Sequence, residues 1–431
     1  MPITDVYDYS ENIGGTSAAP SMGYIIKVAS RCNLNCPYCY MYNLGDDTYL
    51  SKPKIMAVRI FEQSIDAIKA YMEVNKLPFV AIYLHGGEPL LAGKGRFESY
   101  LRAIRERLGC DTVAKVHVQT NGVLIDAAWI DLFNRYDVGV GVSLDGPEEI
   151  HDIYRITHAG KGTHNRTEAG IALLKLRLNR DVSSLCVINP EHDPISIYDY
   201  IVSQGIKTCD FILPDFHHSM PPPFKSELLS GYLIKLYDHW YGKNDPDLQI
   251  RFFVSVMTAM IGGGSTIDAI GAHPISDVVV ETDGNLQPLD VLRTCENGFT
   301  LTSLHVGRNS IEDLRRTPLF QVGLNNQRLL PTKCHECSAY HICGGGYLPH
   351  RYERGTGFRN PSVHCDALLA TITHIHATLT ADLSVSSPDR RGAGAARKQQ
   401  SKAEPQHDGA SKTLLPDKQP RKTVERLPNR A

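Results

Sequence analysis

The sequence predicts an α/β protein built on a parallel sheet, followed by a small cysteine-rich domain and a disordered tail. Short apolar runs rich in β-branched residues alternate with amphipathic stretches from residue 23 to about residue 216. This alternation is the pattern of repeated β/α units. Cysteines then recur at short spacing between residues 334 and 365, and the chain after residue 384 loses its aromatic residues and its apolar periodicity.

Six apolar runs are expected to be strands. The stretch between the first two, residues 55–74, has apolar residues at three- and four-residue steps, which predicts a helix. Six units are too few for a closed eight-stranded barrel. The expected strands are residues 24–29, 79–85, 114–120, 138–144, 182–188 and 209–214.

Residues that could bind a ligand or take part in catalysis follow the strands. The carboxyl ends of parallel strands meet at one edge, where such folds build their sites. The sequence therefore predicts one site at this edge. The segments expected there are Cys32, Cys36 and Cys39 after the first strand, HGGEP (85–89) after the second, TNG (120–122) after the third, SLDGP (143–147) after the fourth and INP (188–190) after the fifth.

The rest of the chain divides by composition. The stretch 217–280 contains the proline run 221–223 and a predicted helix at 224–242, and the tail from residue 387 carries eleven basic and five acidic residues. A solvated tail is the simplest interpretation of that charge. The expected divisions are an N-terminal segment 1–21, a barrel 22–235, a connector 236–280, a cysteine-rich domain 281–383 and a tail 384–431.

Composition excludes several classes of protein. A formal charge of −2 over 431 residues gives no reason to expect a nucleic-acid or membrane partner, and no apolar run is long enough to span a bilayer. The N-terminus has neither the basic start nor the apolar core of a secretory signal. The eleven cysteines are therefore expected to be reduced thiols of a cytoplasmic protein.

The run CNLNCPYCYMYN is the most informative motif. Cys32, Cys36 and Cys39 supply three thiolates for a cubane iron–sulfur cluster, which normally takes four. A triplet without a fourth cysteine nearby leaves one iron open for a small molecule. The other interpretation is a zinc site, which needs a fourth ligand, and His85 is the nearest histidine downstream.

This triplet resembles the signature of the radical SAM superfamily. The resemblance implies a partial (β/α)6 TIM-type barrel and a [4Fe–4S] cluster whose open iron chelates S-adenosylmethionine (SAM). It further implies reductive cleavage of SAM to a 5′-deoxyadenosyl radical, with electrons from a donor such as flavodoxin or ferredoxin.

The resemblance also implies a SAM site. Gly86, Gly87 and Glu88 are similar to the family's GGEP motif, which binds the methionine amino group, and the two glycines let backbone approach a ligand closely. Asn121 and Ser143 are expected to bind the ribose. Arg155 is expected to contact bound SAM because a guanidinium can clasp a carboxylate, the alternative being a surface charge. Asp145, which precedes Gly-Pro, is expected to be a turn former.

A second set of four cysteines completes a closed site. Their spacing suits structural zinc or an iron–sulfur cluster equally well. Their order resembles the SPASM domain of radical SAM peptide maturases, which favours one auxiliary [4Fe–4S] cluster. The full SPASM pattern has seven cysteines for two clusters, but here Tyr347 and Leu289 occupy two of those positions. The expected ligands are Cys334, Cys337, Cys343 and Cys365.

The resemblance is strongest to SPASM maturases that form cyclophanes in ribosomally synthesised precursor peptides. It implies a bond between an aromatic ring carbon and the β-carbon of a residue two positions later. By similarity to sulfatase-maturing relatives, Asp290 would be the catalytic base that accepts a proton, and the auxiliary cluster would take an electron. A turn aspartate is the equal alternative, and Asp215, His217 and His218 are lesser pocket candidates.

Three alternatives remain open from the sequence. An anaerobic sulfatase-maturing enzyme would form formylglycine, although members of that family carry all seven cysteines. A peptide epimerase or thioether-forming maturase would share the cofactors and differ in product. A noncatalytic iron–sulfur protein that binds a peptide is the alternative of another class.

Overall fold

The chain folds around one nine-stranded sheet. The computed structural model describes residues 22–109 and 113–385. The strand order is β7-β6-β5-β4-β3-β2-β1-β8-β9, and only the β8–β9 pair is antiparallel. The strands are β1 (Gly23–Ala29), β2 (Phe79–Gly86), β3 (Val113–Thr120), β4 (Val138–Ser143), β5 (Ser183–Val187), β6 (Thr208–Ile212), β7 (Gln249–Ile250), β8 (Val278–Val280) and β9 (Leu286–Gln287).

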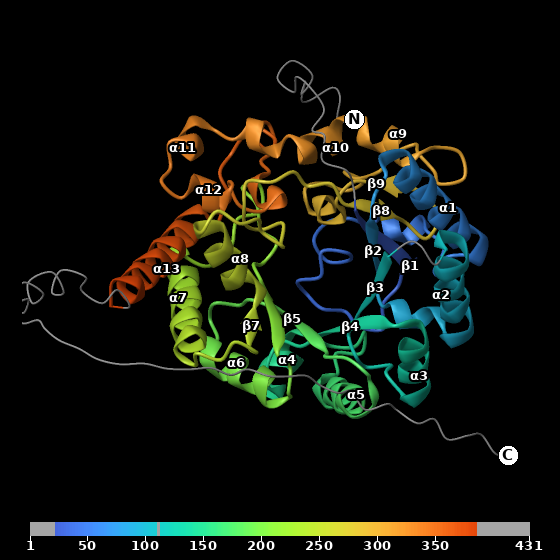
Figure 1. Cartoon of the computed structure of the whole chain (residues 1–431), viewed down its shortest axis with the longest axis horizontal. Coiled ribbons are helices and arrows are strands. Elements are labelled where there is room, and N and C mark those ends of the chain that lie inside the picture. Colours follow the sequence, from blue (N-terminus) through green and yellow to red (C-terminus); the bar gives the residue numbers. More distant parts are fainter. Residues whose placement is uncertain (1–21, 110–112, 386–431) are drawn as a thin grey trace, which may run out of the picture. The chain divides into compact units, whose positions relative to one another are not determined.

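Helices connect the strands and cover the outer side of the curved sheet, as Figure 1 shows for α1, α2, α3 and α5. The first eight are α1 (Val58–Asn75), α2 (Lys94–Leu108), α3 (Ala127–Tyr136), α4 (Glu148–Tyr154), α5 (His164–Arg177), α6 (Pro194–Ser203), α7 (Ser226–Gly242) and α8 (Arg251–Met260). The C-terminal part contains α9 (Ile311–Arg315), α10 (Pro318–Leu324), α11 (Thr332–His335), α12 (Tyr340–Cys343) and α13 (Cys365–Val385).

The first β/α unit shows why the sequence folds this way. Ile26 and Val28 of β1 are fully buried and join one hydrophobic core with Phe61 and Ile65 of α1, which are four residues apart on one helix face. Because side chains alternate along a strand, Lys27 points to the opposite face, which is the inner face of the curved sheet. It is also fully buried.

The C-terminal module, residues 281–380, contributes to two hydrophobic clusters. Helices α9 and α13 pack into the main core. A second, smaller cluster joins η4 (Asp290–Thr294), α10 and η6 (Leu348–Arg351) and includes Leu289, Leu292, Phe299, Leu348 and Phe358. The 3-10 helices η4 and η6 face each other within it. Figure 1 shows α9 to α12 above the ends of the strands.

The expected fold class is confirmed. All six predicted strands are present within two residues of their expected ends, and the helices expected at 55–74 and 224–242 are α1 and α7. The sheet extends further than expected, because β7, β8 and β9 are two or three residues long and carry no periodicity that a sequence pattern can detect.

Of the described residues, those up to Thr380 form one compact unit, and residues 381–385 belong to a second. The domain boundaries expected inside the first unit stay predictions. The predicted N-terminal segment and nearly all of the predicted disordered tail lie outside the described residues, as does Cys110. Within the described part of the chain, no helix is long and apolar enough to cross a membrane.

Candidate functional site

The loop that carries Cys32, Cys36 and Cys39 follows β1 and is held by backbone contacts. Asn35 N donates to the Ile156 carbonyl at 2.8 Å, and His158 Nε2 lies 3.0 Å from the carbonyl oxygen of Cys32. The segment after α4 therefore clamps the cysteine loop against the strand ends.

The three thiols are neighbours. Burial, together with the charges of Glu88, Cys39 and Cys36, raises the pKa of Cys32 to about 12, so these groups lie close to it. No three His, Cys, Asp or Glu side chains in the described ranges are placed to hold one metal ion. A cubane cluster binds each thiolate to a different iron, so its ligands need not converge on one point.

The GGEP segment packs against the start of the cysteine loop. Gly87 N donates to the Ala29 carbonyl at 2.9 Å and Glu88 N to the Arg31 carbonyl at 3.0 Å. A Cβ on Gly87 would overlap the Arg31 carbonyl and the Tyr42 hydroxyl. These glycines therefore let the GGEP backbone pack closely against the backbone of the cysteine loop, in addition to any ligand that they let approach.

Glu88 is fully buried, and its carboxylate is hydrogen-bonded to other groups of the chain. It accepts hydrogen bonds from Leu90 N (3.0 Å), the Thr120 hydroxyl (2.8 Å) and Asn121 N (2.8 Å). Burial raises its pKa to about 7 against the lowering effect of these donors. Glu88 thus ties the loop after β2 to the loop after β3.

Asn121 and Ser143 lie at the predicted edge of the sheet. The Asn121 amide donates to Asn33 Oδ1 at 2.9 Å and lies 3.8 Å from the Cys32 sulfur. Ser143 accepts a hydrogen bond from Gln119 at 3.0 Å. Asn121 is therefore beside the cysteine loop itself, and Ser143 lies one strand further along.

Arg155 is buried and bound to Asp145. Arg155 Nε lies 2.9 Å from one carboxylate oxygen of Asp145, and Nη2 lies 3.1 Å from the other. Asp145 also accepts hydrogen bonds from the Tyr38 hydroxyl and from Val187 N. The surface-charge interpretation of Arg155 is wrong, and Asp145 does more than form a turn: it fixes the guanidinium beside the cysteine loop.

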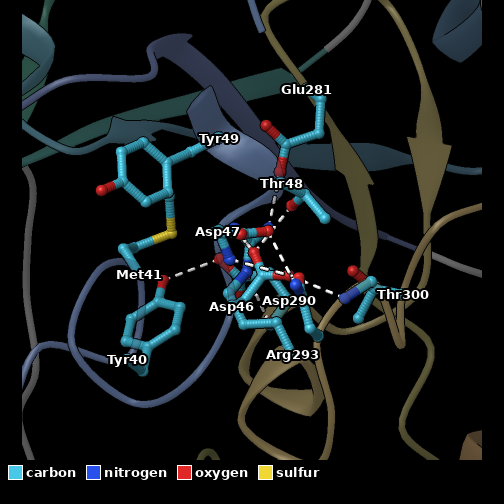
Figure 2. Close-up of polar contacts among 12 residues, drawn as sticks. Tyr40, Met41, Asp46, Asp47, Thr48, Tyr49, Glu281, Asp290, Arg293 and Thr300 are labelled. Atoms are coloured by element: carbon cyan, nitrogen blue, oxygen red, sulfur yellow. Dashed lines mark hydrogen bonds and ion pairs between the residues drawn. The ribbon is translucent and has the colours of Figure 1, made fainter. Parts of the chain in front are cut away.

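Asp290 belongs to a buried ion network. Its carboxylate lies 3.0 Å from Lys27 Nζ and accepts a hydrogen bond from Tyr40 at 2.7 Å. Lys27 also pairs with Glu281 (3.1 Å), while Arg293 pairs with Glu281 (2.7 Å). Figure 2 shows Asp290, Glu281 and Arg293 of the C-terminal module converging with Tyr40 of the loop after Cys39.

These contacts decide the charge of Asp290. Burial by itself would raise its pKa, but Lys27, Arg293 and the Tyr40 hydrogen bond outweigh burial and hold the pKa well below its usual range. A carboxylate in this state is a weak proton acceptor. The expected role of Asp290 as a base stays a prediction, and the geometry favours a positioning role.

Four cysteines line one cavity in the C-terminal module. The cavity has a volume of about 60 Å³, several times the ~10–15 Å³ that one water molecule requires. Cys343 ends α12, and burial raises its pKa to about 12. Cys334, Cys337 and Cys365 are on the same cavity wall, so the structure brings together the whole predicted set.

The sequence interpretation missed Lys27 and Arg293. Both are buried, and both neutralise carboxylates that are distant in sequence. Lys27 had a detectable signal, because a lysine inside the apolar run YIIKVA requires a buried partner. Arg293 had none, since nothing in DVLRTC distinguishes it from a surface residue.

Comparison with known proteins agrees with this geometry. Residues 26–201 match the Radical SAM superfamily. The cysteine-type anaerobic sulfatase-maturating enzyme of Clostridium perfringens is 27% identical over 346 residues, covering 76% of this chain and 89% of that enzyme. The serine-type enzyme of Bacteroides thetaiotaomicron is 25% identical over 365 residues, covering 78% and 84%.

Solved structures share the fold. Native anSMEcpe with bound AdoMet superposes with a TM-score of 0.73 at 23% identity, covering 84% of this chain and 99% of that one. Streptococcus suis SuiB bound to its precursor peptide SuiA has a TM-score of 0.53 at 14% identity, covering 79% and 75%. With the cysteine triplet at the strand ends and the match over residues 26–201, the chain contains a radical SAM domain and is an enzyme of radical chemistry.

Proposed function

We propose that this enzyme modifies a ribosomally synthesised precursor peptide by joining an aromatic ring carbon to the β-carbon of a residue two positions later. The observation that carries this proposal is the C-terminal cavity, which gathers four cysteines for one auxiliary cluster. Tyr347 and Leu289 stand where the SPASM resemblance would place two cysteines of another cluster.

The proposed cofactors are SAM, a SAM-binding [4Fe–4S] cluster and one auxiliary [4Fe–4S] cluster. Cys32, Cys36 and Cys39 would hold the first cluster, and the four cavity cysteines the second. When bound, SAM and its cluster supply a 5′-deoxyadenosyl radical that abstracts hydrogen from an unactivated carbon. A donor such as flavodoxin or ferredoxin would supply the electrons.

The residues of the chain fit a polar ligand beside the first cluster. The buried Tyr42 hydroxyl lies over Gly87 and has no hydrogen-bond partner among the described residues. Its pKa is raised by burial and by the charges of Cys32 and Cys39, which places it beside the triplet. A buried hydroxyl of this kind needs a partner, and the SAM methionine group would offer one.

Each predicted SAM-site residue would then have a task. Asn121 would present its amide next to Cys32, and Arg155 would hold its charge beside the cluster loop with Asp145 fixing its plane. Ser143 would offer its hydroxyl at the end of β4. Glu88 would act by joining the two loops around Gly86 and Gly87, since all of its hydrogen bonds go to the chain itself.

Formylglycine formation is the second candidate. It is favoured by the similarity to anaerobic sulfatase-maturating enzymes, which extends over 89% of the Clostridium perfringens enzyme. The two products differ chemically, because formylglycine is an aldehyde and a cyclophane is not.

The test is co-expression with a short aromatic-containing precursor peptide, taken from the gene beside this one if that gene encodes such a peptide, followed by high-resolution mass spectrometry and fragmentation. A loss of two hydrogens is expected, with no backbone fragments inside a three-residue segment that contains an aromatic residue. Serine oxidation to formylglycine would also remove two hydrogens, so an aminooxy reagent is needed to distinguish the two products.

The control is the Cys36→Ala variant, which should leave the peptide unmodified. A peptide that reacts with the aminooxy reagent would identify formylglycine and refute the crosslink. An unchanged mass alongside continued 5′-deoxyadenosine formation would also count against crosslinking.

A further inference from the structure

Asp215 and His350 form a pair at the edge of the sheet where the C-terminal module begins to cover it. Asp215 follows β6, His350 belongs to η6, and Asp215 Oδ1 lies 3.7 Å from His350 Nε2. His350 keeps only 1% of its side chain exposed, yet neither ring nitrogen has a hydrogen-bond partner in the described part of the chain. Leaving such a group unpaired costs about 1–3 kcal/mol, which indicates that another polar group completes the site.

Other side chains largely enclose the pair. The rings of Tyr347 and His364 pack edge-on against His350 at 5.1 and 4.8 Å. Asp215 lies deep in the protein but keeps 17% of its side chain accessible. Asp215 interacts electrostatically with five titratable groups of the described chain: His350, His364, Tyr347, Asp290 and Cys295.

The carboxylates of Asp215 and Asp290 differ in their affinity for a proton. Burial raises the pKa of Asp215 to about 7, and the charge of Asp290 adds to that effect. Burial lowers the pKa of His350 to about 3, so its ring is neutral near pH 7. A base works best when its pKa is near the working pH, and Asp215 meets this condition whereas the ion-paired Asp290 does not.

We propose that Asp215, which lies beside the ring of His350, accepts the proton that leaves the substrate during crosslinking. This rests on the proposed function, in which the peptide loses two hydrogens. One leaves the β-carbon as a hydrogen atom and yields 5′-deoxyadenosine. The other leaves the ring carbon as a proton to the Asp215 carboxylate, while one electron leaves to an iron–sulfur acceptor as the C–C bond forms. Asp290 then serves to position Tyr40.

The experiment measures crosslinked peptide per 5′-deoxyadenosine in the reconstituted holoenzyme, with the precursor peptide of the co-expression test as substrate. Asp215→Asn is expected to lower this ratio on the order of 10²-fold while SAM cleavage continues, since removing a general base typically costs 10²–10⁴-fold. In the unaltered enzyme the ratio should rise with pH through about 7. His350→Gln should shift that profile, and Asp215→Glu should restore part of the ratio.

Asp277→Asn is the matched control. Burial and the charge of Asp268 also raise the pKa of Asp277 to about 7, but this carboxyl has no histidine pair among the described contacts. The ratio of crosslinked peptide to 5′-deoxyadenosine in the Asp277→Asn variant should equal that of the unaltered enzyme. A crosslink formed normally by Asp215→Asn would overturn the inference and leave the proposed function intact. A peptide that the unaltered enzyme never crosslinks would overturn both.

Discussion

The Tyr40 hydroxyl donates a hydrogen bond to the Asp290 carboxylate at 2.7 Å. Tyr40 directly follows Cys39, and Asp290 begins η4 in the C-terminal module. This contact therefore connects the loop of the cysteine triplet with the module that carries the second cysteine set. The position of that loop depends on the charges that keep Asp290 ionised.

Lys27→Met should destabilise the protein. The substitution keeps the length of the side chain but leaves Asp290 and Glu281 short of one buried cation. Breaking a buried pair by removing one partner costs about 3–5 kcal/mol. Anaerobic urea unfolding of the variant would measure this loss.

Lys94→Met is the matched control for Lys27→Met. Lys94 pairs with Asp126 at 2.7 Å, but both side chains are about half exposed. Such exposed pairs contribute about 0–1 kcal/mol. Equal losses in the two variants would contradict the importance given to the buried network.

Gly87→Ala should also destabilise the protein. The added Cβ would overlap the Arg31 carbonyl and the Tyr42 hydroxyl, so the GGEP segment and the cysteine loop would have to separate. Overpacking of this kind costs about 1–3 kcal/mol. Thermal unfolding should show a lower Tm, and the loaded enzyme should hold its iron less firmly.

Gly95→Ala provides the opposite case. Gly95 lies in α2, and a Cβ there would meet nothing within 4 Å. Alanine should stabilise the helix by about 0.5–1 kcal/mol. If Gly87→Ala raised Tm as well, the backbone contact at Gly87 would not be as tight as the structure shows.

The sequence predicted those parts of the fold that repeat. Each strand from β1 to β6 is five or more residues long and contains several apolar or β-branched residues, and α1 has buried residues at three- and four-residue steps. The two-residue strands β7 and β9 are defined by their neighbours alone. No pattern within Gln249–Ile250 or Leu286–Gln287 could have revealed them.

The sequence predicted the parts of the candidate site that lie in short motifs. It did not predict the contacts between residues that are far apart in the sequence. Both cysteine sets are dense enough to be recognised in the sequence. The partnership of Arg155 with Asp145 and of Lys27 with Asp290 depends on which strands become neighbours in the sheet. The pairing of Asp215 with His350 depends on how the C-terminal module folds back over β6.

Glu88 should make stability depend on pH. Burial raises its pKa from 4.5 to about 7 in the folded protein, so the folded state holds this proton more tightly than the unfolded state. Its contribution to stability is therefore full below about pH 4.5, falls as pH rises to about 7 and is constant above. At 1.4 kcal/mol per pKa unit, the change amounts to at most about 3.5 kcal/mol.

Glu88→Gln removes this titration. The free energy of unfolding, measured between pH 4.5 and 8, should therefore fall less steeply in the variant than in the unaltered protein. Asp215 and Asp277 titrate in the same range in both proteins, so their effect cancels in the comparison. Parallel curves would show that the Glu88 carboxyl is not protonated in the folded state near neutral pH.

Cys343→Ser should abolish the auxiliary cluster and spare the other. Four cysteines surround the C-terminal cavity, and a [4Fe–4S] cluster that loses one thiolate ligand is weakened. The unaltered protein should hold about eight iron atoms per chain and the variant about four, as two clusters and one cluster require. Cys186→Ser, which changes a buried thiol of β5 outside both sets, should keep all eight. Iron analysis after anaerobic reconstitution would decide this, and an equal loss in both variants would show that a packing defect, rather than a missing ligand, removes the iron.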